Sequence, residues 1–278
     1  MVKLIVTDVD GTLVPDGGDS SHLNKKYYEI IKRLNALGVT FAVASGRQYS
    51  SVKRLFAPIS ESIYCISEGG GLVFKDGEML YSQTMKKKIV ENIITDIKKL
   101  PLCDAMISGI KKVYVENENS KLYRWMKDCY KYDIEAVGDL TAPIDDEIVK
   151  VSLFHPENQA EEVAKGWFTD KWSQYVQVSV AGIQWVDLVE KSTNKGTAVQ
   201  FLQQRFGIHP EETVVFGDNM NDVPMFGKAG VSFAVKNARE EVRKKAAFVC
   251  DSYRKDGVYE QLEQIEASIR KKMNIGRR

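Results

Sequence analysis

The chain alternates short apolar runs with stretches of helical spacing, and this alternation limits its fold more than any other feature. An apolar run at residues 4–6 is followed by apolar residues at helical spacing over 23–37, and then by a continuous apolar run at 39–44. A second helix is expected around 52–56 and a third strand at 63–66. Strands and helices in this order are typical of parallel strands joined by crossover helices. We therefore predict an α/β fold with a doubly wound, Rossmann-like parallel sheet.

The rhythm changes in the middle of the chain. Helices and strands are expected there in mixed order, and regular alternation returns with the helix expected at 196–206. We therefore predict a discontinuous core formed by residues 1–82 plus 189–278, with an α+β domain inserted at 83–188. Within the insertion we expect helices up to residue 100, at 121–131 and beyond 161, and strands at 105–107, 113–115, 148–154, 175–180 and 185–189. After it we expect strands at 213–216, 231–234 and 247–249, and helices at 239–245 and 258–269.

The composition is that of an ordinary globular protein and disfavours several classes of function. Hydrophobic residues make up 44% of the chain and the formal net charge is +1 at pH 7, so no field of one sign would attract nucleic acid or an anionic membrane. The chain opens without an apolar signal region, and no stretch approaches the length of a membrane span. Its four cysteines include no CxxC pair. We therefore expect a cytoplasmic protein with reduced thiols that binds neither nucleic acid nor membrane, and no protein partner is evident.

Two carboxylates and a glycine stand directly behind the first apolar run, in the order Asp8-Val9-Asp10-Gly11. A strand that ends here would deliver both acids to the edge of the sheet, and Gly11 permits the backbone to turn. Asp and Gly are also the commonest residues of ordinary solvated turns. The motif alone therefore leaves a functional and a purely structural interpretation open.

Further polar clusters stand at predicted strand ends or just before a predicted helix. They are Ser45-Gly46-Arg47, Lys195 and Gly217-Asp218-Asn219-Met220-Asn221-Asp222. Each alone could be a helix cap or a turn. Ligands of open α/β sheets bind along the carboxyl edge of the strands, so we expect these clusters to meet Asp8 at that edge. Four independent polar clusters at one edge favour a functional site over an accident.

The chemistry of these clusters points to a cation and a phosphoryl group. Each pair of like charges among Asp8, Asp10, Asp218 and Asp222 would cost roughly 4 kcal/mol at about 4 Å with surface-like screening, so we expect a bound cation. Hard oxygen ligands without nearby His or Cys select Mg²⁺. Lys195 would add a second positive charge, and such a site suits a phosphoryl group. Asp8 could then attack phosphorus, while the neighbouring Asp10 moves protons.

The four clusters together resemble the four motifs of the haloacid dehalogenase superfamily. Residues 8–13 are similar to motif one, Ser45 to motif two, Lys195 to motif three and residues 217–222 to motif four. The segment 251–258 is similar to the closing turn of the Cof-like subgroup. The insertion lies between motifs two and three and resembles a cap domain of the C2B type. One departure is visible, because Glu68 stands where many relatives have Asn.

The resemblance implies a Mg²⁺-dependent phosphatase that hydrolyses a small phosphorylated metabolite, such as a sugar phosphate, through an aspartyl-phosphate intermediate. It implies that Asp8 is the nucleophile and a metal ligand, and that Asp10 is the acid/base with its backbone carbonyl on the metal. The other implied roles are phosphoryl binding by Ser45, Gly46 and Asn221, charge neutralisation by Lys195, completion of the metal site by Asp218, and support of Lys195 or a metal-bound water by Asp222. Two alternatives stay open: a phosphotransferase or phosphosugar mutase that uses the same intermediate, and a non-catalytic regulator that binds a phosphorylated ligand.

Overall fold

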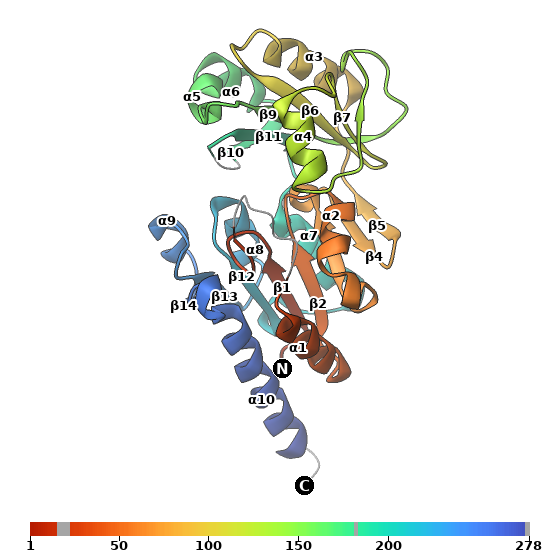
Figure 1. The fold of residues 1–278 in the computed structure, drawn as a ribbon. Coiled ribbons are helices and arrows are strands. Elements are labelled where there is room, and N and C mark those ends of the chain that lie inside the picture. Colours follow the sequence, from red (N-terminus) through yellow and green to blue (C-terminus); the bar gives the residue numbers. More distant parts are fainter. Residues whose placement is uncertain (16–22, 181–182, 276–278) are drawn as a thin grey trace. The chain divides into compact units, whose positions relative to one another are not determined.

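The structure is a computed structural model, and it describes residues 1–15, 23–180 and 183–275 (Figure 1). The chain divides into two compact units. The first consists of Met1–Leu80 with Asn194–Arg278, and the second consists of Tyr81–Thr193. Among the described residues, none of the helices combines the length and the apolar character that crossing a bilayer requires.

The first unit is built on an eight-stranded sheet in the order β14-β13-β12-β1-β2-β3-β4-β5. The strands are β1 (Leu4–Asp8), β2 (Thr40–Ala44), β3 (Tyr64–Ser67), β4 (Leu72–Lys75), β5 (Glu78–Ser82), β12 (Thr213–Gly217), β13 (Val231–Val235) and β14 (Phe248–Cys250). Strands β14 through β3 pair in parallel, and only then does an antiparallel partner, β4, follow. The predicted doubly wound parallel sheet is therefore confirmed.

Strand β1 lies at the centre of this sheet because it is apolar on both faces. All five of its residues are buried, as expected for a parallel strand covered on both sides. From β1 the chain proceeds outward through β2 and β3, and it returns to the other side of β1 with β12. The strand order therefore reverses between β1 and β12, which is where open α/β sheets bind ligands.

The helices of the first unit follow the predicted spacing, except that α8 was not expected. They are α1 (Lys25–Ala36), α2 (Tyr49–Leu55), α7 (Lys195–Phe206), α8 (Val223–Phe226), α9 (Glu240–Arg243) and α10 (Gly257–Ile275). Helix α1 buries Tyr27, Ile30, Ile31 and Leu34 along one stripe, and it packs against α10. Helix α10 runs six residues beyond the expected end at 269. The sequence did not predict these last turns, because they are exposed and show no apolar periodicity.

The second unit is an α+β domain with a six-stranded sheet in the order β10-β11-β9-β6-β7-β8. Its strands are β6 (Asp104–Gly109), β7 (Val113–Val115), β8 (Ile134–Ala136), β9 (Ile148–Phe154), β10 (Val176–Val180) and β11 (Trp185–Glu190); its helices are α3 (Lys87–Ile97), α4 (Lys121–Asp128), α5 (Ala160–Ala164) and α6 (Trp167–Trp172). Side chains of α3, α5 and α6 share one hydrophobic cluster with the sheet, and those of α4 belong to another.

Two expectations in this unit were wrong in detail, and one strand was not expected at all. The helix expected at 121–131 ends at Asp128, and Lys131 adopts a positive φ of 55°. The helix expected beyond residue 161 is two helices, α5 and α6, separated by Gly166 with φ +81°. Strand β8 was not expected, because its three residues are at least partly exposed and show no apolar pattern.

A glycine loop after β3 packs closely on the start of α7. Within the turn Glu68–Gly70, Gly69 and Gly70 have φ values of +68° and +108°. A Cβ on Gly70 would lie 2.3 Å from the backbone oxygen of Asn194, whereas a Cβ on Gly69 would meet no atom within 4 Å. Asn194 caps α7, because its side chain accepts a hydrogen bond from the Thr197 backbone N–H. The loop therefore helps to place the first residue of α7, Lys195.

Replacing Gly70 by Ala should destabilise the protein more than replacing Gly69 by Ala. Both alanines must take a positive φ, at a cost of about 1 to 2 kcal/mol. At position 70 the overlap with a backbone atom adds about 1 to 3 kcal/mol. Denaturant unfolding of the two variants measures the difference, and equal losses would contradict the close packing of this loop on α7.

Candidate active site

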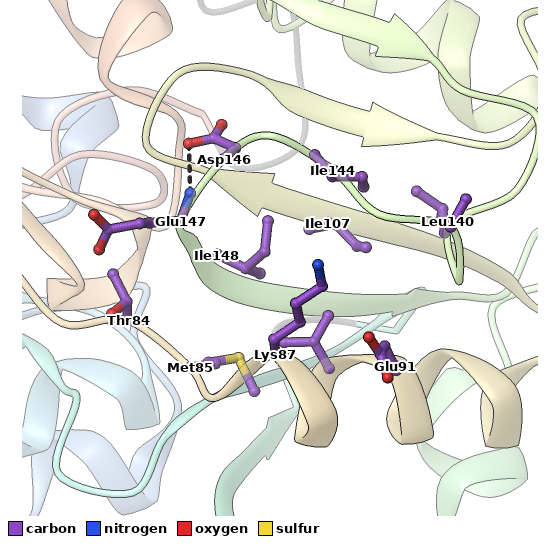
Figure 2. Close-up of a pocket in the computed structure, with 12 residues that line it drawn as sticks. Thr84, Met85, Lys87, Glu91, Ile107, Leu140, Ile144, Asp146, Glu147 and Ile148 are labelled. Atoms are coloured by element: carbon purple, nitrogen blue, oxygen red, sulfur yellow. Dashed lines mark hydrogen bonds between the residues drawn. The ribbon is translucent and has the colours of Figure 1, made fainter.

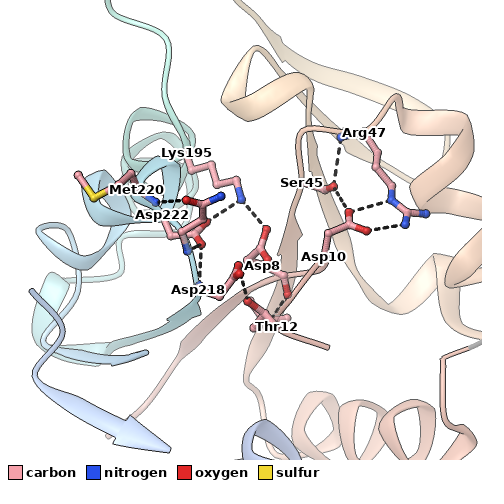
Figure 3. A network of polar contacts seen from close by, with 11 residues as sticks. Asp8, Asp10, Thr12, Ser45, Arg47, Lys195, Asp218, Met220 and Asp222 are labelled. Carbon is pink, nitrogen blue, oxygen red and sulfur yellow. Dashed lines mark hydrogen bonds and ion pairs between the residues drawn. The ribbon is translucent and has the colours of Figure 1, made fainter. Parts of the chain in front are cut away.

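Asp8, the last residue of β1, lies against a fully buried lysine. Lys195 Nζ donates to Asp8 Oδ1 at 2.5 Å and to Asp222 Oδ1 at 2.6 Å (Figure 3). The lysine side chain is only 1% exposed. Its position follows from the fold, because α7 begins at Lys195 and Asp222 follows β12, the neighbour of β1. Residues from three separate parts of the chain therefore meet at the point where the strand order reverses.

The loop after β12 is folded around the side chain of Asp222. Its second oxygen, Oδ2, accepts hydrogen bonds from the backbone N–H groups of Asp218 at 2.8 Å and Asn219 at 3.0 Å. Asp218 in turn approaches the motif at the end of β1, where Thr12 Oγ1 donates to Asp218 Oδ1 at 3.3 Å. A Cβ on Gly11 would lie 2.3 Å from Asp218 Oδ2, and Gly11 has a φ of +80°. Only glycine allows this contact without displacement.

The electrostatics of the network are governed by burial. Burial raises the pKa of Asp8 well above its usual value, and the Asp222 carboxylate raises it further, although Lys195 opposes both. Burial alone would lower the pKa of Lys195, but the Asp222 and Asp8 carboxylates outweigh it and hold that pKa above its ordinary value. Lys195 therefore remains a cation, and it is the counter-charge of two buried acids.

The acids also fit a divalent cation. Among the residues that the structure describes, Asp8, Asp218 and Asp222 offer carboxylate oxygens that all lie within 4.8 Å of one another. Asp8 Oδ2 is buried and has no hydrogen-bond partner. One lysine against three carboxylates leaves negative charge in a place removed from water, which is costly unless a cation neutralises it. An oxygen-only donor set of this kind suits Mg²⁺.

The carboxylate of Asp10 turns away from this group toward the loop after β2. Arg47 donates from Nε to Asp10 Oδ2 at 2.8 Å and from Nη2 to Oδ1 at 2.5 Å (Figure 3). Ser45 Oγ donates to Asp10 Oδ2 at 3.5 Å and accepts from the Arg47 backbone N–H at 3.1 Å. A Cβ added to Gly46 would meet no atom within 4 Å. The two acids of the β1 motif therefore have different partners.

Asn221, the remaining residue of the predicted site, lies in the turn Met220–Asp222 and is exposed. Glu68 is buried beside the loop that carries Ser45. The Glu68 backbone N–H donates to the Arg47 carbonyl at 3.1 Å, and that of Gly69 donates to the Ser45 carbonyl at 3.0 Å. Glu68 and Gly69 thus support the Ser45 loop through their backbone N–H groups.

Three residues of the network were not among the predicted site residues. Arg47 directly follows the predicted Gly46, and Thr12 lies two residues after the predicted Asp10; that proximity was the available signal. Asn237 follows β13, and its Nδ2 donates to the Gly11 carbonyl at 2.7 Å while its Oδ1 accepts from the Tyr253 backbone N–H at 3.3 Å. Its place after a parallel strand is the only sequence signal it carried.

The second unit contains a cavity of about 170 Å³ between α3 and its sheet (Figure 2). Its lining is mainly apolar, with Met85, Ile107, Leu140 and Ile148 around it. Lys87, Glu91, Asp146 and Glu147 also line it. Asp146 accepts hydrogen bonds from the Lys111 backbone N–H and from the Tyr114 hydroxyl. The cavity is therefore suited to hold an apolar group, and its lining lacks the buried lysine–carboxylate network found around Asp8.

Replacing Lys195 by Met, without divalent cations present, should cost about 3 to 5 kcal/mol of stability, because two buried acids lose their counter-charge. The loss should shrink as the pH falls. The pKa of Asp8 is already raised, so in the folded variant Asp8 takes up a proton more readily than in the unfolded chain, and acid then favours the folded state. Urea unfolding at neutral and at acid pH measures both effects.

Lys171 provides the matched control for this substitution. It also bonds a buried acid, Asp96, at 2.6 Å, but its own side chain is 48% exposed and Lys99 bonds the same acid. Replacing Lys171 by Met should cost less than about 1 kcal/mol. A loss in K195M that is as small as this, or that does not change with pH, would contradict the assigned role of Lys195.

Known proteins share both the sequence pattern and the fold. The model of the haloacid dehalogenase-like hydrolase family matches residues 5–262. The 5-amino-6-(5-phospho-D-ribitylamino)uracil phosphatase YbjI of Escherichia coli is 26% identical over 264 residues, which cover 95% of this chain and 96% of that protein. YcsE of Bacillus subtilis, also named as a 5-amino-6-(5-phospho-D-ribitylamino)uracil phosphatase, is 24% identical over 259 residues, which cover 92% of this chain and 93% of that protein.

A solved structure agrees with these matches. A crystal structure of a protein from Eubacterium rectale is 35% identical, has a TM-score of 0.86, and covers 95% of this chain and 99% of its own. The match spans both compact units, so the similarity includes the inserted domain as well as the core. The resemblance inferred from the four motifs is confirmed. The chain belongs to the haloacid dehalogenase-like hydrolase family, and it is a phosphatase of that family.

Proposed function

We propose that the protein is a Mg²⁺-dependent phosphatase that hydrolyses a small phosphorylated metabolite, such as a sugar phosphate, through an aspartyl-phosphate intermediate. The observation that carries the proposal is the buried network of Asp8, Lys195 and Asp222 at the point of strand-order reversal. It combines a carboxylate with one oxygen free of hydrogen bonds, a fixed cation, and a surplus of negative charge. These are the requirements of a site that transfers a phosphoryl group to a carboxylate.

In this proposal Asp8, Asp218 and the backbone carbonyl of Asp10 hold the Mg²⁺, and Asp222 supports it through a water or supports Lys195. The bound ion would supply positive charge to the phosphoryl oxygens. Lys195 supplies a second charge from the side of α7, and its raised pKa supports a role as a permanent cation. Asp222 accepts hydrogen bonds from both Lys195 and the Asp218 backbone N–H, so it fixes the position of the lysine relative to the loop that carries Asp218.

The chain's own groups carry out two displacements at phosphorus. In the first, Asp8 forms a bond to phosphorus, the bond to the leaving oxygen breaks, and Asp10 donates a proton to that oxygen. In the second, a water attacks phosphorus, Asp10 takes its proton, and the bond to Asp8 breaks to release phosphate. The Ser45 hydroxyl, the Gly46 backbone N–H and the Asn221 amide bind the phosphoryl oxygens during both steps.

The inserted domain is proposed to act as the cap that selects the substrate. Two relatives are named for a substrate with a phosphorylated ribityl chain, and this supports a polyol or sugar phosphate as the substrate class here. We place the protein in the cytoplasm, which its four free cysteines support. Ranking phosphorylated sugars, sugar alcohols and nucleotides by kcat/KM identifies the substrate.

Replacing Asp8 by Asn should lower kcat for 4-nitrophenyl phosphate with Mg²⁺ by at least about a thousandfold, because the nucleophile is lost. Replacing Asp10 by Asn should cost about 10² to 10⁴ in rate. A far-ultraviolet circular dichroism spectrum and a melting temperature check the fold of each variant. Wild-type activity in D8N would overturn the proposal, and so would phosphate that appears without Mg²⁺.

Mg²⁺ should bind more weakly as the pH falls. The pKa of Asp8 is raised by its burial and by Asp222, so below that pKa the ion must displace a proton. Isothermal titration calorimetry of the chelator-treated protein at neutral and at mildly acid pH measures the effect without relying on turnover. Replacing Asp218 by Asn should weaken binding about 10- to 100-fold. Binding that is equal at both pH values and in both proteins would place the metal elsewhere.

A further inference from the structure

We propose that Arg47 is a positioning residue, which holds the carboxylate of Asp10 and so sets how that acid meets the leaving oxygen. This inference rests on the proposed function, since it assigns the support of a group that the mechanism uses. Arg47 itself has no part in the two displacements described above. Its effect on the reaction would pass through Asp10.

The geometry of the pair is that of a two-point clamp. The guanidinium donates through Nε to one oxygen of Asp10 at 2.8 Å and through Nη2 to the other at 2.5 Å (Figure 3). Two parallel bonds between planar groups fix the orientation of the carboxylate as well as its position. A lysine has a single charged centre and cannot reproduce that fork.

Arg47 is itself buried, and its backbone is held by neighbouring loops. The Arg47 side chain is 7% exposed and that of Asp10 is 20% exposed, so water competes little for either group. The Arg47 backbone N–H donates to Ser45 Oγ at 3.1 Å, and its carbonyl accepts from the Glu68 backbone N–H at 3.1 Å. Both bonds tie the arginine to the loops after β2 and β3. The guanidinium is therefore placed before any substrate arrives.

The position of the clamp fits the task of directing a proton. Asp10 Oδ2 lies 3.5 Å from Ser45 Oγ, which is proposed to bind the phosphoryl group. Asp8 is two residues away in sequence, but its carboxylate bonds Lys195 instead. The proposed acid, Asp10, and the proposed nucleophile, Asp8, are thus held by different cationic side chains. Arg47 is the support of the acid, as Lys195 is of the nucleophile.

Leaving-group dependence tests the inference. An acidic phenol such as 4-nitrophenol leaves without help, whereas phenol itself needs a proton from the enzyme. With Mg²⁺ present, replacing Arg47 by Gln should lower kcat/KM, which reports the first displacement alone, at least about tenfold more for phenyl phosphate than for 4-nitrophenyl phosphate. Replacing Arg47 by Lys should recover part of the loss. In a protein that already carries D10N, adding R47Q should cause no further selective loss.

Arg33 supplies the matched control. It also donates through Nε to a carboxylate, that of Glu266, at 3.0 and 3.1 Å, but it joins α1 to α10 away from Asp10. Replacing Arg33 by Gln should lower the melting temperature and leave the ratio of the two kcat/KM values as in the wild type. Melting temperatures of all variants separate a loss of folded protein from a change in the reaction.

Two outcomes would overturn the role of Arg47 while leaving the proposed function intact. One is an equal loss of kcat/KM for both esters, which would make Arg47 a substrate contact or a structural residue. The other is a selective loss from R47Q that multiplies fully with that of D10N. A wild-type protein that hydrolyses neither ester with Mg²⁺ would instead sink the proposed function, and this inference with it.

Discussion

The buried contact of Lys195 with Asp8 and Asp222 is the interaction on which the rest of the site depends. Each partner comes from a different part of the chain, and each would be costly to bury alone. Together they join β1, the start of α7 and the loop after β12. The contact therefore belongs to the fold as much as to the chemistry, because it closes the core across a long insertion. The two carboxylates hold the pKa of Lys195 above its ordinary value, and Lys195 opposes the burial that raises the pKa of Asp8.

The motif at the end of β1 divides its two acids between separate environments. Asp8 stays in line with the strand and meets a lysine, a buried setting that favours metal and nucleophile chemistry. Asp10 lies beyond the strand, is partly exposed, and meets a guanidinium. Gly11 makes this division possible, because its positive φ and missing side chain let the turn pass against Asp218. Two acids only two residues apart thus have different partners and different exposure.

Glycine loops set the precision of the site without contributing a functional group. Gly70 lets the loop after β3 contact the backbone of Asn194, next to Lys195. The same loop bonds the backbone of Ser45 and Arg47 through its N–H groups. A substitution there would move Lys195 and Arg47 together. Such positions have no side chain to inspect, and their importance follows only from the distances that a side chain would violate.

The sequence by itself determined the architecture of the core and the edge at which the site lies. Apolar runs at strand length, helical spacing and polar clusters at strand ends are local signals, and each survives in the structure, as in β1, α1 and the loop after β12. Short elements were missed where that signal is weak, as in β8, whose residues are partly exposed. The break between α5 and α6 was missed for a related reason, since it depends on one glycine with a positive φ.

Only the tertiary structure decided which side chains pair. The clamp of Arg47 on Asp10, the link from Asn237 to Gly11 and the bond from Lys195 to Asp222 join residues that are far apart in the chain. Strand order and side-chain direction create these pairs, and neither is encoded in the spacing of a single motif. The sequence therefore indicates which residues can meet at the edge of the sheet, and the packing of the loops selects the partners that do.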